Sequence, residues 1–272
     1  MDLGQYECDG QFSLFDYEDG FSVKEKHPMR IDKPIRLIET FAGIGSQAMA
    51  LRDLGVEFTH HRVIEFDQKA MASYNAIHGT NFEPSDIQTV KGEDLGITEK
   101  EKFCYILTYS FPCQDLSLAG RMKGMEKGSN TRSGLLWEVE RILTECKEYN
   151  GNLPDLLLME NVSQVHGKGN LEHFGQWLKF LESLGYQNLW FDLNAKEIGI
   201  PQNRKRCFCV SWLDKDATFT PPETIPLDAI MADYLETEVE EKYYINSERA
   251  QKLIDKLVDD NPEIVNEVLK KN

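Results

Sequence analysis

Short apolar runs alternate with amphipathic stretches along the middle of the chain, and this alternation predicts the secondary structure. The apolar runs are short and lack strict polar alternation, which is typical of strands buried in a parallel sheet. The amphipathic stretches repeat apolar residues at helical spacing, and several end at a glycine. In the second of them, Asp67 is the predicted N-cap and Gly79 the predicted end. We predict an α/β fold with a strand from Ile35, further strands at 61–66, 103–107, 156–159, 189–195 and 207–212, and helices at 46–54, 68–78, 135–146 and 171–184.

The helical spacing also predicts which side chains face the core. The core-facing positions are Ala48, Leu51 and Leu54 in the first helix, Leu135, Leu136, Val139, Ile142, Leu143 and Cys146 in the third, and Leu171, Phe174, Leu178 and Leu181 in the fourth. Residues 1–34 lack a sustained pattern and are predicted to be a flexible tail. Residues 35–215 are predicted to be the main domain, and residues 216–272 a linker followed by amphipathic helices, the first with Leu253, Ile254, Leu257 and Val258, the second with Ile264, Val265, Val268 and Leu269.

A cysteine follows the most apolar of the predicted strands. Pro112 ends the run at 103–107, and Cys113 comes next. Open α/β sheets bind ligands at the carboxyl ends of their strands, so Cys113 is a candidate nucleophile. The alternative is a structural cysteine, because a free cysteine is usually a small buried apolar residue.

A glycine turn follows the first strand. Gly43 and Gly45, with Ala48, fit the G-x-G-x-x-G/A form in which a nucleotide-like ligand approaches the backbone at a helix N-terminus. Glu65 lies 20 residues beyond Gly45, where such folds bind a ribose hydroxyl. Asp86, next to Ile87, is near another predicted strand end and is a candidate partner for an adenine amino group. The alternative for each acid is a helix cap or a solvated loop.

Two more charged groups occur where predicted elements meet. Glu160 and Asn161 end the strand at 156–159, and Gln202, Arg204 and Arg206 precede the last strand. The loop from Ser117 to Arg132 contains three glycines and has a charge of +3, from the basic residues Arg121, Lys123, Lys127 and Arg132 against Glu126. Such a loop suits phosphate groups, although a solvated loop is the plainer interpretation.

Composition narrows the class of protein. The 272 residues have a formal net charge of −16, which argues against bulk electrostatic coating of nucleic acid or anionic membranes. The six cysteines form no CxxC pair and the histidines no HxxxH pair, so we expect no disulfide framework and no metal. No run has the length of a membrane span, and the first ten residues are acidic, so we expect a cytoplasmic protein with no membrane partner.

Four segments in this order resemble the motifs of the cytosine-5 DNA methyltransferases. They are FAGIG at 41–45, FPCQ at 111–114, MENV at 159–162 and QNRKR at 202–206. The resemblance implies a Rossmann-like α/β sheet with helices on both faces that binds S-adenosylmethionine, as well as DNA as the substrate. It implies that the cofactor-binding residues are Phe41, Gly43, Gly45, Glu65, Phe66, Asp86, Ile87 and Pro112, and that the catalytic residues are Cys113, Glu160, Arg204 and Arg206.

The chemistry of that family explains these residue types. C5 of cytosine is a poor nucleophile, so the thiolate of Cys113 is expected to add to C6 and make C5 electron-rich. Glu160 would hydrogen-bond N3 and the exocyclic amine, while Arg206, with Arg204 nearby, would hold O2. The base must leave the duplex, and the loop at 117–132 could hold the opened strand.

The resemblance fades after Trp212, and this sets two further expectations. The remaining residues contain no arginine-rich leucine segment and no GNSV-like motif, so a second subunit is expected to supply target recognition. The alternative is a truncated remnant with little activity. The peptide from Gln11 to Phe15 resembles the short motif that docks into the bacterial sliding clamp. The alternatives are a cytosine-5 RNA methyltransferase and a non-enzymatic interaction protein on the same fold.

Overall fold

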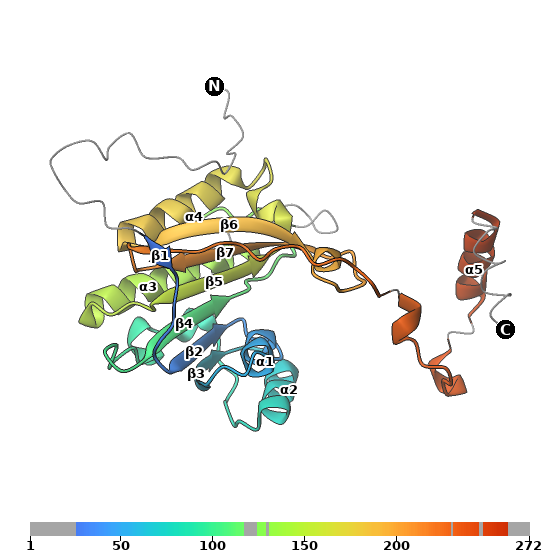
Figure 1. Ribbon diagram of the computed structural model, residues 1–272, viewed down its shortest axis with the longest axis horizontal. Helices are drawn as coiled ribbons and strands as arrows, with labels where there is room; N and C mark the ends of the chain where they lie inside the picture. Colours follow the sequence, from blue (N-terminus) through green and yellow to red (C-terminus); the bar gives the residue numbers. More distant parts are fainter. Residues whose placement is uncertain (1–25, 117–123, 129–130, 230, 245–246, 261–272) are drawn as a thin grey trace. The chain divides into compact units, whose positions relative to one another are not determined.

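A six-stranded sheet forms the centre of the protein (Figure 1). The computed structural model describes residues 26–116, 124–128, 131–229, 231–244 and 247–260. The strand order is β3-β2-β4-β5-β7-β6. The strands are β2 (Ile35–Thr40), β3 (Phe58–Ile64), β4 (Cys104–Tyr109), β5 (Leu156–Asn161), β6 (Gln187–Asn194) and β7 (Lys205–Trp212).

Only β7 runs against the other strands of this sheet. The strands β3, β2, β4 and β5 pair in parallel, while β7 pairs antiparallel with both β5 and β6. Parallel neighbours bring the carboxyl ends of β2, β3, β4 and β5 to one edge, and the antiparallel pairing brings the start of β7 to the same edge. This edge carries the predicted chemistry.

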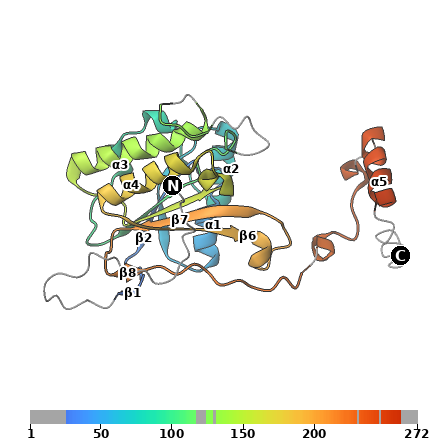
Figure 2. The same ribbon diagram turned by 90° about the horizontal axis from the view of Figure 1, so that it is seen from above.

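Helices cover both faces of the sheet, as predicted (Figure 2). On one face, Ala48 of α1 (Ser46–Asp53) packs with Leu37 and Ile106. On the other face, α3 (Leu136–Asn150) and α4 (Leu171–Leu184) share the main core with the next residue along each strand, such as Leu107. Successive strand residues point to opposite faces, which explains the two cores. A further helix, α2 (Gln68–His78), begins at its N-cap Asp67 and ends at Gly79, as predicted.

Two predicted core positions are wrong. Leu54 is 76% exposed because α1 ends at Asp53, before that side chain can turn inward. Leu171 is 44% exposed because it is the first residue of α4. Further along the helix, Trp177 is buried in the core. Arg206 lies within β7, although it was expected to precede the strand. The predicted stripe of α3 is confirmed: Leu136, Val139, Ile142, Leu143 and Cys146 are buried.

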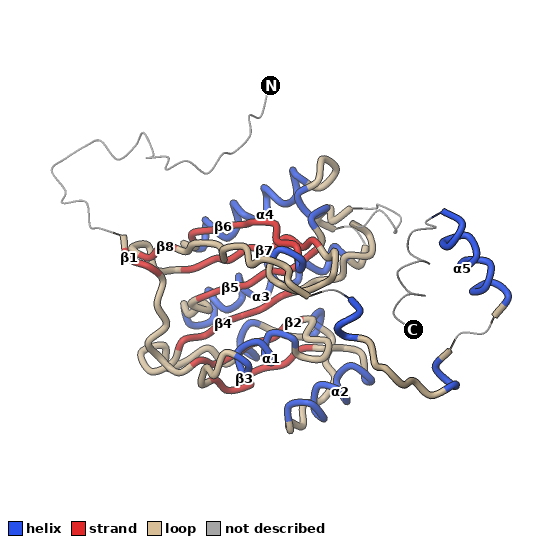
Figure 3. The backbone as a smooth tube through the Cα atoms, turned by 45° about the vertical axis from the view of Figure 1, so that its right-hand side comes forward, coloured by secondary structure: helices blue, strands red, loops and turns tan. Residues whose placement is uncertain are grey.

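The described part of the predicted tail is attached to the domain. The short strand β1 (His27–Pro28) pairs in parallel with β8 (Ala217–Thr218), and Met29 packs against Trp212 and Ala217. Figure 3 shows β1 and β8 side by side. A two-residue strand leaves no periodic signal, which is why the sequence does not predict it. Residues 1–25, including the predicted clamp peptide, lie outside the described residues.

The chain divides into two compact units at Pro226. The second unit starts at Leu227 and contains the amphipathic helix α5 (Glu248–Asp260). Its apolar residues Leu253, Ile254, Leu257 and Val258 are 42 to 59% exposed. The predicted helix at 264–269 lies outside the described residues. Within the described ranges, no helix is long and apolar enough to cross a membrane.

Candidate active site at the carboxyl edge of the sheet

The loop that carries Cys113 is held at three backbone or side-chain positions. Asn161, at the end of β5, donates from Nδ2 to the carbonyl of Phe111 at 2.9 Å. Ser133 donates its hydroxyl to the carbonyl of Pro112 at 2.6 Å, and Gln47 of α1 donates to the hydroxyl of Ser110 at 3.3 Å. Cys113 is therefore presented by a loop fixed to elements on both sides.

Cys113 differs from the other described cysteines in its exposure. Cys104, Cys146, Cys207 and Cys209 are buried, whereas Cys113 is only partly buried. Burial raises the pKa of the Cys104 thiol to about 11 and that of Cys146 to about 12, so these thiols stay protonated at neutral pH. A nucleophile must form a thiolate and reach a substrate. Among the described cysteines, Cys113 is the accessible one.

Glu160 and Arg206 form an ion pair across β5 and β7. The Nε atom of Arg206 lies 3.0 Å from Oε1 of Glu160, and the two side chains are 22% and 27% exposed. In the antiparallel register, Glu160 is opposite Phe208 and Asn161 is opposite Cys207. Arg206 lies two residues before Phe208 and therefore on the same face of the sheet, diagonally across from Glu160. The sequence predicted both residues at element ends but not their contact.

Arg204 lies just before β7 and is exposed. Its backbone N–H donates to Oδ1 of Asn194 at 2.9 Å, and its carbonyl accepts from the N–H of Ala195 at 3.1 Å. Asn194, at the end of β6, also donates to Asn203 at 2.8 Å. The segment that leads into β7 is thus fixed by β6. These contacts involve only the backbone of Arg204, so the role of its guanidinium stays a prediction.

A cavity of about 410 Å³ lies at the ends of β2, β3 and β4. Six residues predicted to bind the cofactor line it, namely Phe41, Glu65, Phe66, Asp86, Ile87 and Pro112. Sequence reasoning missed its remaining lining residues, Ile64, Ser85, Gln88, Ser110 and Leu135. All five lie outside the four motif segments, so the motifs alone give no signal for them. The volume lies within the range typical of small-molecule sites, about 300 to 1,000 Å³.

The two acids of the cavity already have backbone partners. Glu65 accepts from the N–H of Gly43 through Oε2 and from that of Asp67 through Oε1, both at 2.9 Å. Asp86 was expected near a strand end, but it follows a loop and caps the short 3-10 helix Ile87–Thr89. It accepts from the N–H of Gln88 through Oδ1 at 3.0 Å. These contacts match the helix-cap interpretation for Asp86, and they also fix both carboxylates at the cavity wall.

The predicted glycines build the turn above the cavity but do not line it. Gly45 has a φ of +79°, and a Cβ atom there would lie 2.4 Å from Nε2 of His78 and 2.6 Å from the ring of Tyr74. Only glycine fits both the backbone conformation and the close approach of α2. The role of Gly45 is therefore partly one of packing.

Glu39, in β2, is a buried acid next to this turn that sequence reasoning missed. Its carboxylate is fully buried and accepts hydrogen bonds from the hydroxyl of Tyr74 and from the N–H of Ala48. Burial raises the pKa of this carboxyl above its usual value, against the effect of the two hydrogen bonds. An acid inside an apolar strand was the available signal, because a buried carboxylate needs a partner.

The basic loop is described at 124–128 and from 131 onward. Met125 is fully buried, and its carbonyl accepts from Nε1 of Trp137 at 2.8 Å. Lys127 pairs with Glu140, and Arg132 donates to the side chain of Gln114. Two of the four basic side chains predicted to meet phosphate thus have partners within the protein. Arg121 and Lys123 lie outside the described residues.

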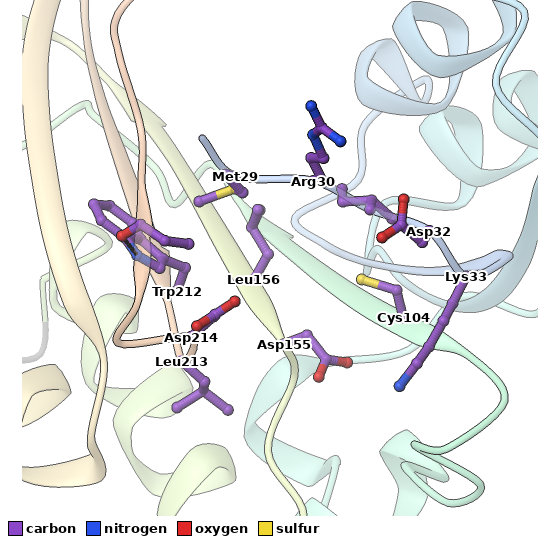
Figure 4. Close-up of a pocket in the computed structure, with 12 residues that line it drawn as sticks. Met29, Arg30, Asp32, Lys33, Cys104, Asp155, Leu156, Trp212, Leu213 and Asp214 are labelled. Atoms are coloured by element: carbon purple, nitrogen blue, oxygen red, sulfur yellow. Dashed lines mark hydrogen bonds between the residues drawn. The ribbon is translucent and has the colours of Figure 1, made fainter. Parts of the chain in front are cut away.

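Two other features lie away from the predicted residues. His166, Asp192 and Cys207 bring nitrogen, oxygen and sulfur atoms within 4.8 Å of one another, but Nζ of Lys205 lies 2.9 Å from Asp192 and supplies a cation there. We assign no metal to this cluster. A cavity of about 280 Å³ at the start of β4 and β5 contains none of the predicted site residues (Figure 4).

Comparison with known proteins identifies the family. Residues 35–271 match a family described as C-5 cytosine-specific DNA methylase, so the match continues past Trp212, where the resemblance was expected to fade. The type II methyltransferase M2.ScrFI of Lactococcus lactis subsp. cremoris is 35% identical over 261 residues, which cover 78% of this chain and 71% of that protein. The orphan methyltransferase M.SssI of Spiroplasma monobiae is 35% identical over 235 residues, which cover 67% of this chain and 60% of that protein.

The fold is similar to that of solved methyltransferase structures. The methyltransferase Dnmt2 of S. pombe superposes with a TM-score of 0.63 at 22% identity, covering 81% of this chain and 65% of that one. The methyltransferase EhMeth of Entamoeba histolytica gives a TM-score of 0.61 at 19% identity, covering 79% of this chain and 63% of that one. The chain belongs to the C-5 cytosine-specific DNA methylases, a family of S-adenosylmethionine-dependent enzymes.

Proposed function

We propose that this protein transfers the methyl group of S-adenosylmethionine to C5 of a flipped cytosine in DNA through a covalent adduct with Cys113. The observation that carries the proposal is the hydrogen bond from Asn161 to the carbonyl of Phe111. It ties the loop of the accessible thiol to the strand end that carries Glu160, whose carboxylate is paired with Arg206. Nucleophile, acid and guanidinium are thereby assembled on neighbouring elements.

The residues divide the reaction between them. The thiolate of Cys113 forms a bond to C6 and pushes electron density to C5, which then takes the methyl group. Glu160 binds N3 and the exocyclic amine of the base, and Arg206 binds O2, so the charge that develops on the ring is stabilised. Loss of the C5 proton and departure of the Cys113 sulfur from C6 restore the aromatic ring.

The cavity at the ends of β2, β3 and β4 suits S-adenosylmethionine, which supplies an electrophilic methyl group when bound. Phe66 is 74% exposed and offers an aromatic face to an adenine. The carboxylate of Glu65 suits a ribose hydroxyl, and that of Asp86 an exocyclic amine. Ile87 is buried and gives the cavity an apolar wall. Polar groups at the rim of an apolar cavity are typical of cofactor sites.

DNA binding must be local, because the chain as a whole is strongly acidic. We propose that the base leaves the duplex to reach Cys113, since C6 is inaccessible inside a helix. Arg204, exposed at the entry to β7, is a candidate for contact with the neighbouring backbone. Phosphate contacts of this kind position the protein but read no sequence.

We further propose that a second chain supplies target recognition. The apolar side chains Leu253, Ile254 and Val258 of α5 are exposed, and they give a surface on which such a chain would pack. The protein alone should then give scattered methylation of genomic DNA read by bisulfite sequencing. Robust methylation at one defined motif would contradict this proposal.

Docking to the bacterial sliding clamp through the peptide from Gln11 to Phe15 remains a separate proposal. Leu14 and Phe15 would be the apolar anchors. Clamp pull-down with Leu14→Ala and Phe15→Ala tests it, with Phe12→Ala as the control inside the same peptide. Equal recovery of all forms would remove the proposal.

Two assays test the main proposal. Tritiated methyl transfer should occur to duplex DNA and not to tRNA, because the family that matches residues 35–271 is described as a C-5 cytosine-specific DNA methylase. Duplex DNA with 5-fluorocytosine at the target should form a complex that survives denaturation, because fluorine at C5 blocks loss of the proton. Transfer to tRNA alone would favour an RNA methyltransferase. No transfer and no cofactor binding would favour a non-enzymatic protein.

A further inference from the structure

Helix α3 holds one wall of the cofactor cavity at two backbone positions. Nη2 of Arg141 donates to the carbonyl of Ile87 at 3.0 Å, and Oε2 of Glu145 accepts from the N–H of Gly92 at 2.8 Å. Ile87 lines the cavity, and Asp86 lies next to it. Both ends of the segment at 87–92 are thus fixed by side chains of one helix.

The guanidinium of Arg141 is itself held in place. Its Nε donates to Glu138 at 2.7 Å and its Nη1 donates to Glu145 at 2.8 Å, which leaves Nη2 directed at Ile87. The side chain is 33% exposed, so it is not part of the apolar core. A planar group with its donors in a rigid fork fixes the acceptor that it meets.

The segment also packs closely against the helix backbone. A Cβ atom at Gly92 would lie 2.3 Å from the backbone nitrogen of Cys146, so only glycine allows this approach. The thiol of Cys146 donates to the carbonyl of Gly92 at 3.2 Å. The position of Ile87 along the cavity wall is therefore set by α3, whose preceding residue Leu135 lines the same cavity.

We propose that Arg141 is a positioning residue for the cofactor. It contacts no reacting atom, and it acts by holding the carbonyl of Ile87 and, through it, the neighbouring carboxylate of Asp86 against the adenosine part of S-adenosylmethionine. This inference rests on the proposed function and assigns a role to a residue outside the four motifs that define the resemblance.

Arg141→Gln should raise the dissociation constant for S-adenosylmethionine about tenfold, which corresponds to the loss of a hydrogen bond from a charged donor. The turnover number at saturating cofactor and the KM for DNA should stay unchanged, because neither involves the wall at Ile87. Lys147→Gln removes the same charge from an exposed position of the same helix and should bind the cofactor as the wild type does. Isothermal titration and steady-state kinetics measure both quantities.

A double-mutant cycle separates positioning from general loss of stability. If Arg141 acts through the segment at Asp86, then adding Arg141→Gln to Asp86→Asn should weaken binding by less than twofold beyond the single Asp86 variant. Independent effects that multiply would contradict the proposal. A merely structural role would lower the melting temperature but would not produce this coupling.

The outcomes are distinguishable from failure of the proposed function. Absence of cofactor binding in the wild-type protein would overturn the proposed function, and this inference with it. Wild-type binding with equal affinity in Arg141→Gln would overturn the positioning role alone. If Arg141→Gln does not fold, Arg141→Lys tests the positioning role instead. One ammonium group cannot bond to the three acceptors of Arg141 in the planar arrangement of a guanidinium. Arg141→Lys should then show the rise in dissociation constant, and wild-type affinity would refute the role.

Discussion

At the end of β5 and the start of β7, the candidate site consists of charged side chains that contact each other, whereas at the ends of β2, β3 and β4 it consists of a cavity with fixed walls. On the side proposed to bind the target base, the Glu160 and Arg206 pair is partly exposed, and we expect it to exchange partners when a base enters. On the cofactor side, Glu65 and Asp86 are anchored to backbone N–H groups. The difference suggests that the target side determines the chemical step and the cofactor side determines affinity.

The largest expected effect is at Cys113. Cys113→Ser should abolish methyl transfer, because a serine hydroxyl is a far weaker nucleophile than a thiolate at neutral pH. Binding of S-adenosylmethionine should stay at the wild-type level. Tritiated methyl transfer and titration calorimetry measure the two properties. Cys104→Ser makes the same change at a buried thiol of β4 and should retain activity when folded. Activity in the Cys113 variant would remove the nucleophile assignment.

Glu160→Gln should have the second-largest effect on methyl transfer. The amide keeps the size of the side chain but loses the charge that pairs with Arg206, and it cannot stabilise a charged ring in the same way. Turnover should fall by about 10² or more with unchanged cofactor affinity. Glu182→Gln on the exposed surface of α4 is the matched control. A wild-type turnover number would show that the ion pair serves structure only.

Asp86→Asn sharpens the comparison from the cofactor side. The amide oxygen can still accept from the N–H of Gln88, so the local cap survives, but the acceptor for an adenine amino group is lost. The dissociation constant for S-adenosylmethionine should rise about tenfold, with turnover at saturating cofactor unchanged. A loss of turnover with unchanged affinity would reverse the assignment of the two sides.

The smallest effect concerns the pH dependence of stability at Glu39. Because burial raises its pKa in the folded protein, the folded state holds the proton more tightly than the unfolded chain. The free energy of unfolding that Glu39 contributes is therefore greatest below the ordinary value of 4.5 and falls as pH rises toward the raised folded pKa. The difference in melting temperature between wild type and Glu39→Gln should change with pH in this window. A constant difference would contradict the burial effect.

Local patterns in the sequence were sufficient to predict the main helices and strands of the sheet domain. The spacing of Val139, Ile142 and Leu143 predicted α3 and its buried stripe, and Asp67 with Gly79 predicted both ends of α2. These features depend on residues within one or two turns, where side-chain direction follows directly from backbone period. Local patterns also indicated Gly43, Gly45, Glu65 and Asp86, whereas Phe41, Phe66 and Pro112 were predicted from the family resemblance.

The tertiary structure decided what the patterns leave open. The stripe of α5 has the same spacing as that of α3, yet Leu253 and Leu257 are more than half exposed, because spacing predicts a helix and not what covers it. The reversed direction of β7 brings Arg206 to Glu160, and β1 pairs with a strand far along the chain.

The hydrogen bond from Arg141 to the carbonyl of Ile87 is another contact that only the tertiary structure reveals. The sequence by itself determined the elements and the residue types at their ends, because these follow from neighbouring residues. The contacts between those ends, and hence which side chains act together, required the folded chain, because distant segments meet only through strand order, strand direction and packing.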